Sequence, residues 1–194
     1  MKNTVTLDKV TKSYDSHTVL CDLSAVIDEN TAIMGASGAG KTTLTRLILG
    51  LESADSGEIR FSGKPRFSAV FQEDRLFEDF TAIENITAII GRGKEKERYA
   101  CDMLSRLMID EEEQNKPTRD FSGGMKRRVA IARALLFESD ILVLDEVFKG
   151  LDENTRDRVA AVIREYARGR LIILITHDKH EAALLGIDRV VVIE

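Results

Sequence analysis

The sequence lacks the features that direct a chain into a membrane, onto nucleic acid or around a structural metal. Its two cysteines, Cys21 and Cys101, do not have the spacing of metal ligands, so we interpret them as reduced thiols. The longest apolar runs, such as LIILI at 171–175, are far too short to span a bilayer, and the N-terminus has no apolar secretory segment. The net charge of −5 gives no general attraction to nucleic acid.

Internal repeats, linkers and low-complexity segments are also missing, and the remaining composition is that of an ordinary globular protein. Hydrophobic residues make up 43% of the chain and charged residues 31%. A length of 194 residues suits one domain with room for a real core, so we expect a single domain over residues 1–194.

The hydrophobic pattern changes along the chain. Residues 3–10 alternate polar and apolar side chains, which predicts a half-buried strand, and residues 17–27 predict one or two more. Short strands buried on both faces are predicted at 31–34, 140–146 and 170–177. Strands that alternate with helices predict an α/β fold with a mostly parallel sheet, an N-terminal antiparallel β subdomain and an inserted α-helical subdomain at about 73–137.

The stretch GASGAGKTT at 35–43, called the phosphate loop below, fits the pattern G-x-x-x-x-G-K-[ST] and lies between a predicted strand and a predicted helix. Its glycines allow backbone N–H groups to converge on phosphates. Lys41 neutralises charge on the β- and γ-phosphates, the Thr42 hydroxyl can ligate Mg²⁺, and Thr43 adds a donor at the helix start. The predicted phosphate-binding residues are Gly35, Ser37, Gly38, Ala39, Gly40, Lys41, Thr42 and Thr43.

A pair of carboxylates follows the apolar strand predicted at 140–146. Asp145 ends that strand, where it can act near a bound metal through water, and Glu146 is available to polarise an attacking water. Together with the phosphate loop, this pair indicates a nucleotide site. The two motifs fit a small-molecule kinase, a GTPase, a helicase or a transport ATPase equally well.

A second candidate phosphate site lies in FSGGMKRRVAIARAL at 121–135. Ser122 is a predicted N-cap, and the glycines after it allow a ligand to approach the backbone. The first helical turn nevertheless carries Lys126, Arg127 and Arg128, and cations there oppose the helix dipole. Either a bound anion relieves this conflict, or the three side chains form a solvated basic face.

The order of the motifs resembles the ATP-binding cassette family, specifically the nucleotide-binding subunit of a membrane transporter, over almost the whole chain. FSGGM is similar to the family signature L-S-G-G-Q, and VFQED carries Gln72 at the position of the Q-loop glutamine. His177 in ITHD stands at the switch-histidine position, and Asp152 in KGLD resembles the D-loop aspartate. Tyr14 lies where the family stacks an aromatic ring on adenine.

The resemblance answers why one chain would carry two phosphate sites. In this family two subunits pair head to tail, and the phosphate loop of one faces the signature of the other, with ATP between them. Ser122, Gly123 and Gly124 would therefore contact the nucleotide held at Lys41 of the partner chain. After hydrolysis the γ-phosphate contacts are lost, and the pair can open.

The resemblance also implies a role for each catalytic residue. Glu146 is the expected general base, and His177 is expected to sense the γ-phosphate. Gln72 is expected at the catalytic centre and, with Thr42 and Asp145, at the Mg²⁺ ion. The implied cofactors are ATP and Mg²⁺.

Some residues depart from the family pattern. Phe121 replaces a leucine, which is an apolar exchange, and Met125 replaces a glutamine, which removes a polar contact to the ribose across the interface. Val147, Lys149 and Gly150 change the usual E-P-F-S-A-L-D, and Lys149 puts a positive charge close to the expected interface. The acid, base and phosphate residues are intact, so we expect an active ATPase.

The expected function is an ATPase subunit at the cytoplasmic face of the cell membrane, peripheral to it, which couples hydrolysis to a separate permease. Residues 72–86 carry large apolar groups, including Phe77 and Phe80, and would receive the permease unless they pack the helical subdomain. QEDRLF at 72–77 resembles importers of small anions or organosulfur compounds. A homodimer is expected with ATP bound, and no nucleic acid.

Other functions remain open at this point. Chromosome and repair ATPases carry a long coiled coil between the Q-loop and the signature. In this chain only 49 residues lie between Gln72 and Ser122, and they show no sustained heptads. Ribosome-associated members carry two cassettes in one chain. A small-molecule kinase would leave the Ser-Gly-Gly signature and His177 unexplained. A cassette that regulates cell-envelope machinery cannot be separated from a transporter by sequence.

Overall fold

The computed structural model describes residues 3–193, which form two compact units. The first unit contains the chain up to Phe67, Ser139–Asp145, and the chain from Gly169 onward. The second unit contains Ser68–Glu138 and Glu146–Arg168. The predicted helical block at 73–137 lies entirely within the second unit.

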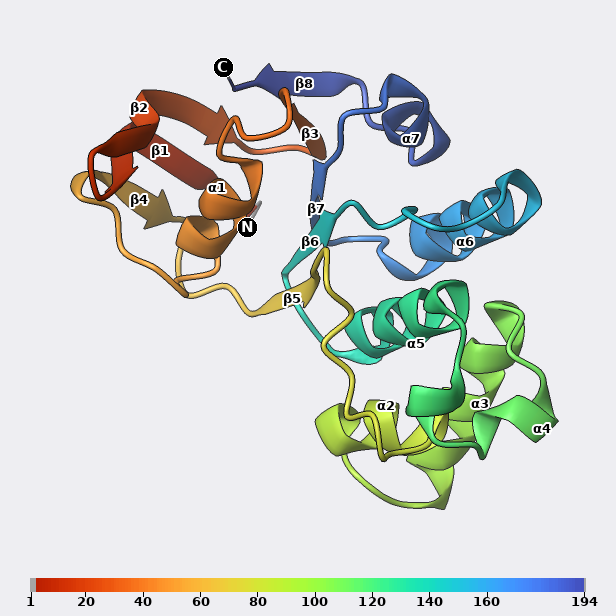
Figure 1. The fold of residues 1–194 in the computed structure, drawn as a ribbon. Helices are drawn as coiled ribbons and strands as arrows, with labels where there is room; N and C mark the ends of the chain where they lie inside the picture. The colour runs from red at the N-terminus through yellow and green to blue at the C-terminus, as the bar shows by residue number, and fades with distance from the viewer. Residues whose placement is uncertain (1–2, 194) are drawn as a thin grey trace. The chain divides into compact units, whose positions relative to one another are not determined.

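An antiparallel sheet forms the N-terminal part of the first unit (Figure 1). Its strands are β1 (Val5–Tyr14), β2 (His17–Ile27) and β4 (Ser56–Phe61), in the order β2-β1-β4. The apolar side chains of β1 are buried at Val5, Leu7 and Val10. The half-buried strand that the polar–apolar alternation predicted is therefore confirmed. Both partners of β1 run antiparallel to it, and the predicted antiparallel β subdomain is confirmed.

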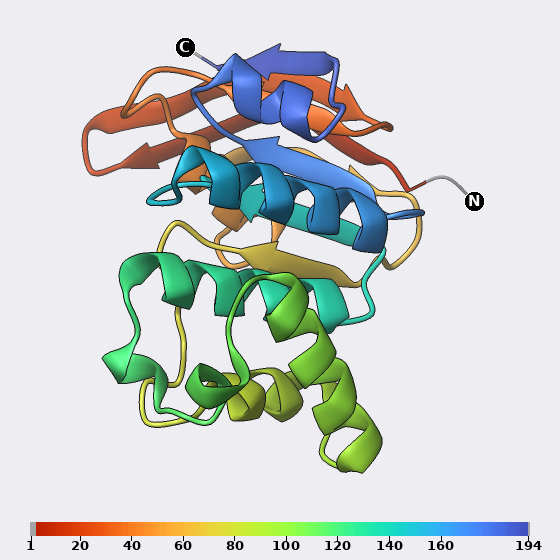
Figure 2. The ribbon, with the colours of Figure 1, turned by 90° about the vertical axis from the view of Figure 1, so that its right-hand side faces the viewer.

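The other sheet of the first unit is parallel (Figure 2). The strands β6 (Ile141–Asp145), β7 (Leu171–Ile175), β3 (Thr31–Met34) and β8 (Arg189–Val192) follow one another in that order. Every residue of β3, β6 and β7 is buried, which explains their apolar sequences. Because these neighbours are parallel, their carboxyl ends lie along one edge of the sheet.

Helices and one short strand complete the two units. In the first unit α1 (Lys41–Ile48) follows β3, and α7 (Lys179–Leu184) follows β7. β5 (Phe67–Val70) begins at the last residue of the first stretch of this unit and runs into the second. The helices of the second unit are α2 (Ala82–Ile90), α3 (Lys94–Arg106), α4 (Glu111–Gln114), the 3₁₀ turn Thr118–Asp120, α5 (Gly123–Leu136) and α6 (Glu153–Tyr166).

The start of α2 shows how local sequence sets an element. Thr81 accepts a hydrogen bond from the Glu84 N–H at 3.1 Å, and the Glu84 carboxylate accepts one from the Thr81 N–H at 2.8 Å. This reciprocal cap fixes the first turn. Ile86 is buried, and α2 packs against α3 and α5. Across residues 3–193, no helix has the length and apolar content that crossing a bilayer requires.

Candidate functional site

The phosphate loop connects β3 to α1 within the first unit. Gly40 stands at the N-cap of α1 and has no side chain that could satisfy the first-turn N–H groups. Lys41 folds back over the loop, and its Nζ donates to the carbonyl oxygens of Gly35 and Ala36, each at 2.7 Å. A helix N-terminus with open N–H groups beside a lysine ammonium is suited to bind phosphate.

The three loop glycines are required for different reasons. A Cβ on Gly35 would lie 2.5 Å from the Ile193 carbonyl oxygen, and a Cβ on Gly40 would lie 2.7 Å from Val19 Cγ1. Packing therefore demands glycine at both positions. Gly38 has φ of +87° but no heavy atom within 4 Å of an added Cβ, so the loop is open there. An open, glycine-lined loop accommodates a phosphate group without displacing protein atoms.

Asp145 lies at the same edge of the sheet as the phosphate loop. Asp145 pairs in register with Ile175 of β7, which in turn pairs with Ile33 of β3. The loop begins at Gly35, directly after β3, so the carboxylate-bearing strand end and the loop share the carboxyl edge. Asp145 is only 2% exposed. The prediction that these two motifs come together is therefore consistent with the fold of the first unit.

His177 follows β7 at this edge, in a turn that is fixed by its neighbours. The preceding Thr176 is fully buried, and its N–H donates to the Ile33 carbonyl at 3.2 Å. The Thr176 hydroxyl accepts a hydrogen bond from the Asp178 N–H at 3.0 Å and donates to Glu181. His177 itself is exposed. The turn thus presents the imidazole at the edge that carries the phosphate loop.

Tyr14 ends β1 and is 41% exposed. Its hydroxyl donates to the Glu52 carboxylate, and the Lys12 ammonium lies 5.5 Å from the ring centroid. The hydrogen bond from Tyr14, with a further contribution from Arg46, lowers the pKa of Glu52 below its usual value. Stacking of Tyr14 on adenine stays a prediction.

The donor set at this edge fits Mg²⁺ held together with a nucleotide. Among residues 3–193, no group of three or more His, Cys, Asp or Glu side chains is arranged to hold a metal alone. Thr42 and Asp145 offer a hydroxyl and a carboxylate oxygen. Mg²⁺ prefers oxygen ligands, keeps several waters and is often held by one or two carboxylates plus substrate phosphates.

The signature lies in the second unit, at the start of α5. The Ser122 hydroxyl accepts a hydrogen bond from the Met125 N–H at 3.3 Å, so the predicted N-cap is confirmed. Nothing lies within 4 Å of an added Cβ on Gly123, and the nearest atom to one on Gly124 is at 3.5 Å. Neither glycine has a positive φ. The fold of this chain therefore does not require glycine at either position.

The basic residues of α5 are not a solvated face, and that interpretation is wrong for both arginines. Arg127 is 4% exposed and donates to the carbonyl oxygens of Phe71 and Gln72, each at 2.6 Å. Arg128 donates to carbonyl oxygens of the loop after α3. Lys126 forms an ion pair of 3.1 Å with a surface glutamate. These internal acceptors satisfy the cations that oppose the helix dipole, without a bound anion.

The remaining predicted residues also belong to the second unit. Gln72 has an exposed side chain, and its carbonyl accepts from Arg127. Glu146 directly follows β6 with φ of +47°, in the left-handed region that non-glycine residues rarely occupy. Asp152 caps α6 by accepting from the Thr155 N–H at 3.0 Å and from its hydroxyl at 2.6 Å. These bonds from Thr155 lower the pKa of Asp152.

The residues that depart from the family pattern occupy different environments. Phe121 and Val147 are buried, so these exchanges preserve apolar packing. Met125 is half-buried in the first turn of α5, and Lys149 is exposed in the turn before α6. Nothing in the structure explains why a lysine occupies position 149.

The structure thus assembles two groups of predicted residues. The first unit brings the phosphate loop, Asp145 and His177 to one edge of the parallel sheet. The second unit holds the Gln72 main chain against α5, the helix that begins at the signature. Sequence reasoning missed the buried Thr176 and the carbonyl-binding role of Arg127. The triplet KRR gave a signal for Arg127, but its charge was assigned to solvent or to an anion.

Comparisons with known proteins agree on one family. A family model described as ABC transporter matches residues 21–149. An aliphatic sulfonates import ATP-binding protein of Pectobacterium atrosepticum is 39% identical, over 97% of this chain and 73% of that protein. A spermidine/putrescine import ATP-binding protein of Haemophilus influenzae is 34% identical, over 99% of this chain but 56% of that protein. The chain thus spans only part of the length of these relatives.

Solved structures give the same result. The dimeric post-hydrolysis structure of the ATP-binding cassette MJ0796 with ADP and Pi matches with a TM-score of 0.89 and 26% identity, over 98% of this chain and 94% of that one. A bacterial Atm1-family ABC exporter with ATP bound matches with a TM-score of 0.85 and 27% identity, over 100% of this chain and 37% of that one. The predicted P-loop NTPase fold is confirmed, and this chain belongs to the ABC transporter family as one of its ATP-binding cassettes, which are ATPases.

Proposed function

We propose that this chain is the ATP-hydrolysing subunit of a membrane transporter, and that its two units act as a single cassette domain. In this proposal two copies pair head to tail around two ATP molecules and drive a separate membrane-spanning subunit. The observation that carries the proposal is the open backbone at Gly123 and Gly124, where the fold itself has no need of glycine. Glycines that a chain does not need for its own folding are explained by the close approach of a ligand.

The nucleotide is held by the chain's own phosphate loop. The first-turn N–H groups of α1 and the Lys41 ammonium bind the phosphates, and Lys41 leaves its two loop carbonyls to do so. Thr42 and Gln72 would hold Mg²⁺, and Asp145 would act on it through a water. When bound, Mg²⁺ neutralises developing charge on the phosphates. Tyr14 stacks on the adenine.

Hydrolysis requires a water in line with the γ-phosphate. Glu146 directly follows Asp145, the last residue of β6. In this proposal its carboxylate accepts a proton from that water. His177 orients the γ-phosphate from the neighbouring strand end. The role of each side chain is to orient the reacting groups and to move one proton, as in other phosphoryl-transfer enzymes.

The second chain completes the site in this proposal. Ser122, Gly123 and Gly124 of one chain donate to the γ-phosphate bound by the other, and Asp152 lies at the same interface. The Ser122 hydroxyl accepts from its own helix and retains its O–H for a phosphate oxygen. A dimeric cassette structure among the structural neighbours supports this arrangement.

The membrane partner docks on the segment 72–86. Phe77 is 49% exposed and Phe80 is 39% exposed, and their ring centroids lie 5.2 Å apart. The alternative that these two rings pack the helical subdomain is not supported by their exposure. Two exposed aromatic rings side by side are suited to bury against another chain. The cassette would thus work at the cytoplasmic face of a membrane.

Import of a small solute is the favoured direction. The relatives named for aliphatic sulfonates and for spermidine/putrescine are import proteins, whereas others are named for Nod factor export and lipoprotein release. The solute itself is selected by the membrane and capture subunits, so this chain does not encode it.

The variant Glu146→Gln tests the catalytic assignment. It should bind ATP with wild-type affinity, whereas its turnover should fall by about 10²–10⁴-fold, the contribution of a positioned general base. The matched control is Glu97→Gln, which alters an exposed glutamate on α3 and should hydrolyse ATP like the wild type. Wild-type turnover in Glu146→Gln would remove this carboxylate from the mechanism.

Purification from native membranes should recover a membrane-spanning chain, and recovery of soluble partners alone would overturn the transport assignment.

A further inference from the structure

The main chain of residues 71–75, called the clamped segment below, is held by two arginines of α5. Arg127 donates through its two terminal nitrogens to the Phe71 and Gln72 carbonyls, each at 2.6 Å. Its Nε lies 3.1 Å from the Asp74 carboxylate. One nearly buried guanidinium thus binds two backbone carbonyls and a carboxylate that belong to the same segment.

The second arginine continues this arrangement. Arg133 donates to the carbonyl oxygens of Asp74 and Arg75, each at 3.0 Å. Arg75 has φ of +47°, and its guanidinium lies over the Phe71 ring at 4.2 Å. Burial raises the pKa of Asp74 and lowers that of Arg133, so this polar cluster is held at an energetic cost. A costly buried arrangement around a predicted catalytic glutamine suggests a function beyond packing.

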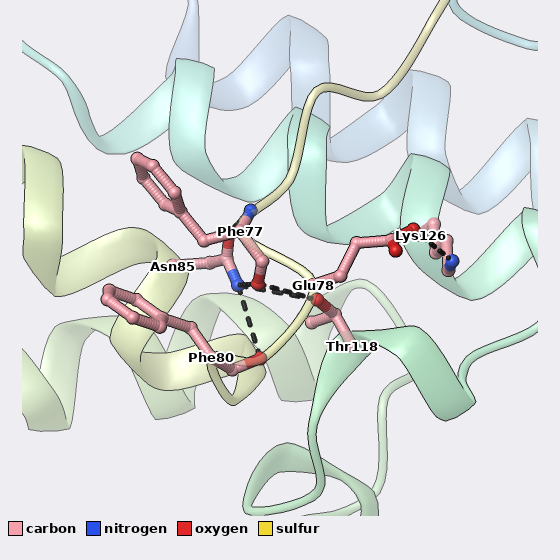
Figure 3. Close-up of polar contacts among 6 residues, drawn as sticks. All are labelled: Phe77, Glu78, Phe80, Asn85, Thr118 and Lys126. Carbon is pink, nitrogen blue, oxygen red and sulfur yellow. Dashed lines mark hydrogen bonds and ion pairs between the residues drawn. The ribbon is translucent and has the colours of Figure 1, made fainter.

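The main chain of the exposed aromatic pair, Phe77 and Phe80, is held by two buried residues that precede the signature in the chain. Asn85 is fully buried, accepts from the Phe77 N–H at 2.9 Å and donates to the Phe77 carbonyl at 3.0 Å (Figure 3). Thr118 is also buried, and it binds the carbonyls of Phe77 at 3.1 Å and of Phe80 at 2.9 Å. Thr118 begins the 3₁₀ turn that leads directly to Ser122.

The first connection ends on α5, and the second ends on α2 and on the 3₁₀ turn that precedes the signature. Figure 3 shows a third contact, the ion pair between Glu78 and Lys126 at 3.1 Å. Because α5 begins at the signature and Arg127 lies in its second turn, these contacts attach the clamped segment close to the signature. Arg127 and Arg133 thus connect the clamped segment to α5, and Lys126 connects Glu78 to the same helix.

We propose that Arg127 is a positioning residue that holds the Gln72 main chain at a fixed place on the signature helix. This inference rests on the proposed function, in which Gln72 acts on the nucleotide of its own chain and Ser122 on that of the partner. Arg127 then joins the two nucleotide sites of a dimer mechanically. Docking of a membrane partner at Phe77 and Phe80 displaces both residues together.

A purely structural role for Arg127 predicts something different. Loss of a packing residue lowers the stability of the second unit and leaves the kinetics of the folded protein unchanged. A positioning role predicts lower kcat at an unchanged KM for ATP, because the phosphate loop belongs to the first unit and is untouched. It also predicts partial recovery by lysine, which keeps the charge but not the two-pronged contact.

The test compares Arg127→Met and Arg127→Lys with Arg106→Met, all in the full chain. Arg106 forms an exposed ion pair with Glu165 in the same unit and does not contact the clamped segment. Amide hydrogen exchange at residues 71–76 is measured together with steady-state hydrolysis over a range of ATP concentrations. Thermal melting of each variant shows whether it is folded.

In Arg127→Met we expect faster exchange at 71–76 and a kcat lower by roughly 10–100-fold, the cost of misplacing a catalytic group. KM for ATP should stay within about twofold, since ground-state binding is unaffected. Arg127→Lys should lie between this variant and the wild type, and Arg106→Met should match the wild type. If Arg127→Met does not fold, the exchange and kcat of Arg127→Lys decide the question in the same way.

Two results separate this inference from the proposed function. A folded Arg127 variant with wild-type exchange and wild-type kcat would overturn the positioning role while leaving the ATPase assignment intact. A wild-type protein that does not hydrolyse ATP would overturn the proposed function, and faster exchange in the Arg127 variants would still support the clamp.

Discussion

The two units hold their predicted functional residues by different means. In the first unit, the phosphate loop, Asp145 and His177 lie at or just after the ends of strands of one parallel sheet, so the backbone ladder sets their positions. In the second unit, the Gln72 main chain is held by arginine side chains that bind its carbonyls. A residue positioned by a sheet is held by many backbone hydrogen bonds, and the loss of one changes its position little. The Gln72 main chain is held by a few arginine contacts, so the loss of one arginine should displace it. The second unit should therefore be more sensitive to single substitutions that lie away from the nucleotide.

The largest effect expected from a change within the first unit concerns the lysine of the phosphate loop. Lys41→Met should lower turnover by about 10²–10³-fold, the cost of removing one preorganised charge-stabilising group. ATP binding should weaken as well, because the ammonium contacts the phosphates in the ground state. Measurement of hydrolysis and of nucleotide affinity tests this, with the exposed Lys64→Met as the control. Near-wild-type turnover in Lys41→Met would separate the loop from the chemistry.

The next effect concerns the second unit and is a loss of stability. Asn85→Leu removes the acceptor of the Phe77 N–H, whereas the Phe77 carbonyl keeps its hydrogen bond from Thr118, so we expect a loss of about 1–3 kcal/mol. Denaturant unfolding measures this loss. Asn115→Ala, which removes an exposed amide bonded only to a nearby carbonyl, should stay within about 0.5 kcal/mol. Equal losses in the two variants would contradict the importance of the Asn85 contacts.

Two glycine substitutions, one in each unit, should have different effects on stability. Gly40→Ala forces a Cβ against Val19 at a positive φ, and it should cost about 1–3 kcal/mol of stability. Gly123→Ala meets no atoms and should leave stability unchanged or raise it by up to about 1 kcal/mol, because alanine favours the helix. Its turnover should nevertheless fall, since the methyl group occupies space kept for the nucleotide. A fully active Gly123→Ala would indicate that nothing approaches this backbone.

The smallest expected effect is a pH dependence at the α6 cap. The folded-state pKa of Asp152 is lowered by its bonds to Thr155, so the cap contributes stability above the ordinary pKa of an aspartate. That contribution is lost as pH falls through the lowered folded-state pKa. The stability difference between wild type and Asp152→Ala should therefore be present near pH 7 and shrink in strong acid. Unfolding curves at several pH values would show this, and a difference that does not change with pH would contradict it.

Local patterns carried the parts of the fold and site that were predictable from sequence. The phosphate loop, the Ser122 cap and the apolar strands each depend on residues close together in the chain, so their physics is visible without a tertiary structure. The burial of Arg127 and its hydrogen bonds were not predictable, because its acceptors, the carbonyls of Phe71 and Gln72, lie more than fifty residues away in the chain. The buried role of Thr176 depends on the neighbouring strand β3 in the same way.

One measurement tests the claim that a nucleotide is bound between two copies of this chain. The hydrolysis-blocked variant Glu146→Gln is examined by sedimentation with and without saturating ATP and Mg²⁺, alone and together with its membrane subunit. The proposal predicts a stable dimer that requires ATP, and a monomer when Gly124 is also replaced by glutamate. A Glu146→Gln protein that binds ATP and stays monomeric in both settings would contradict it.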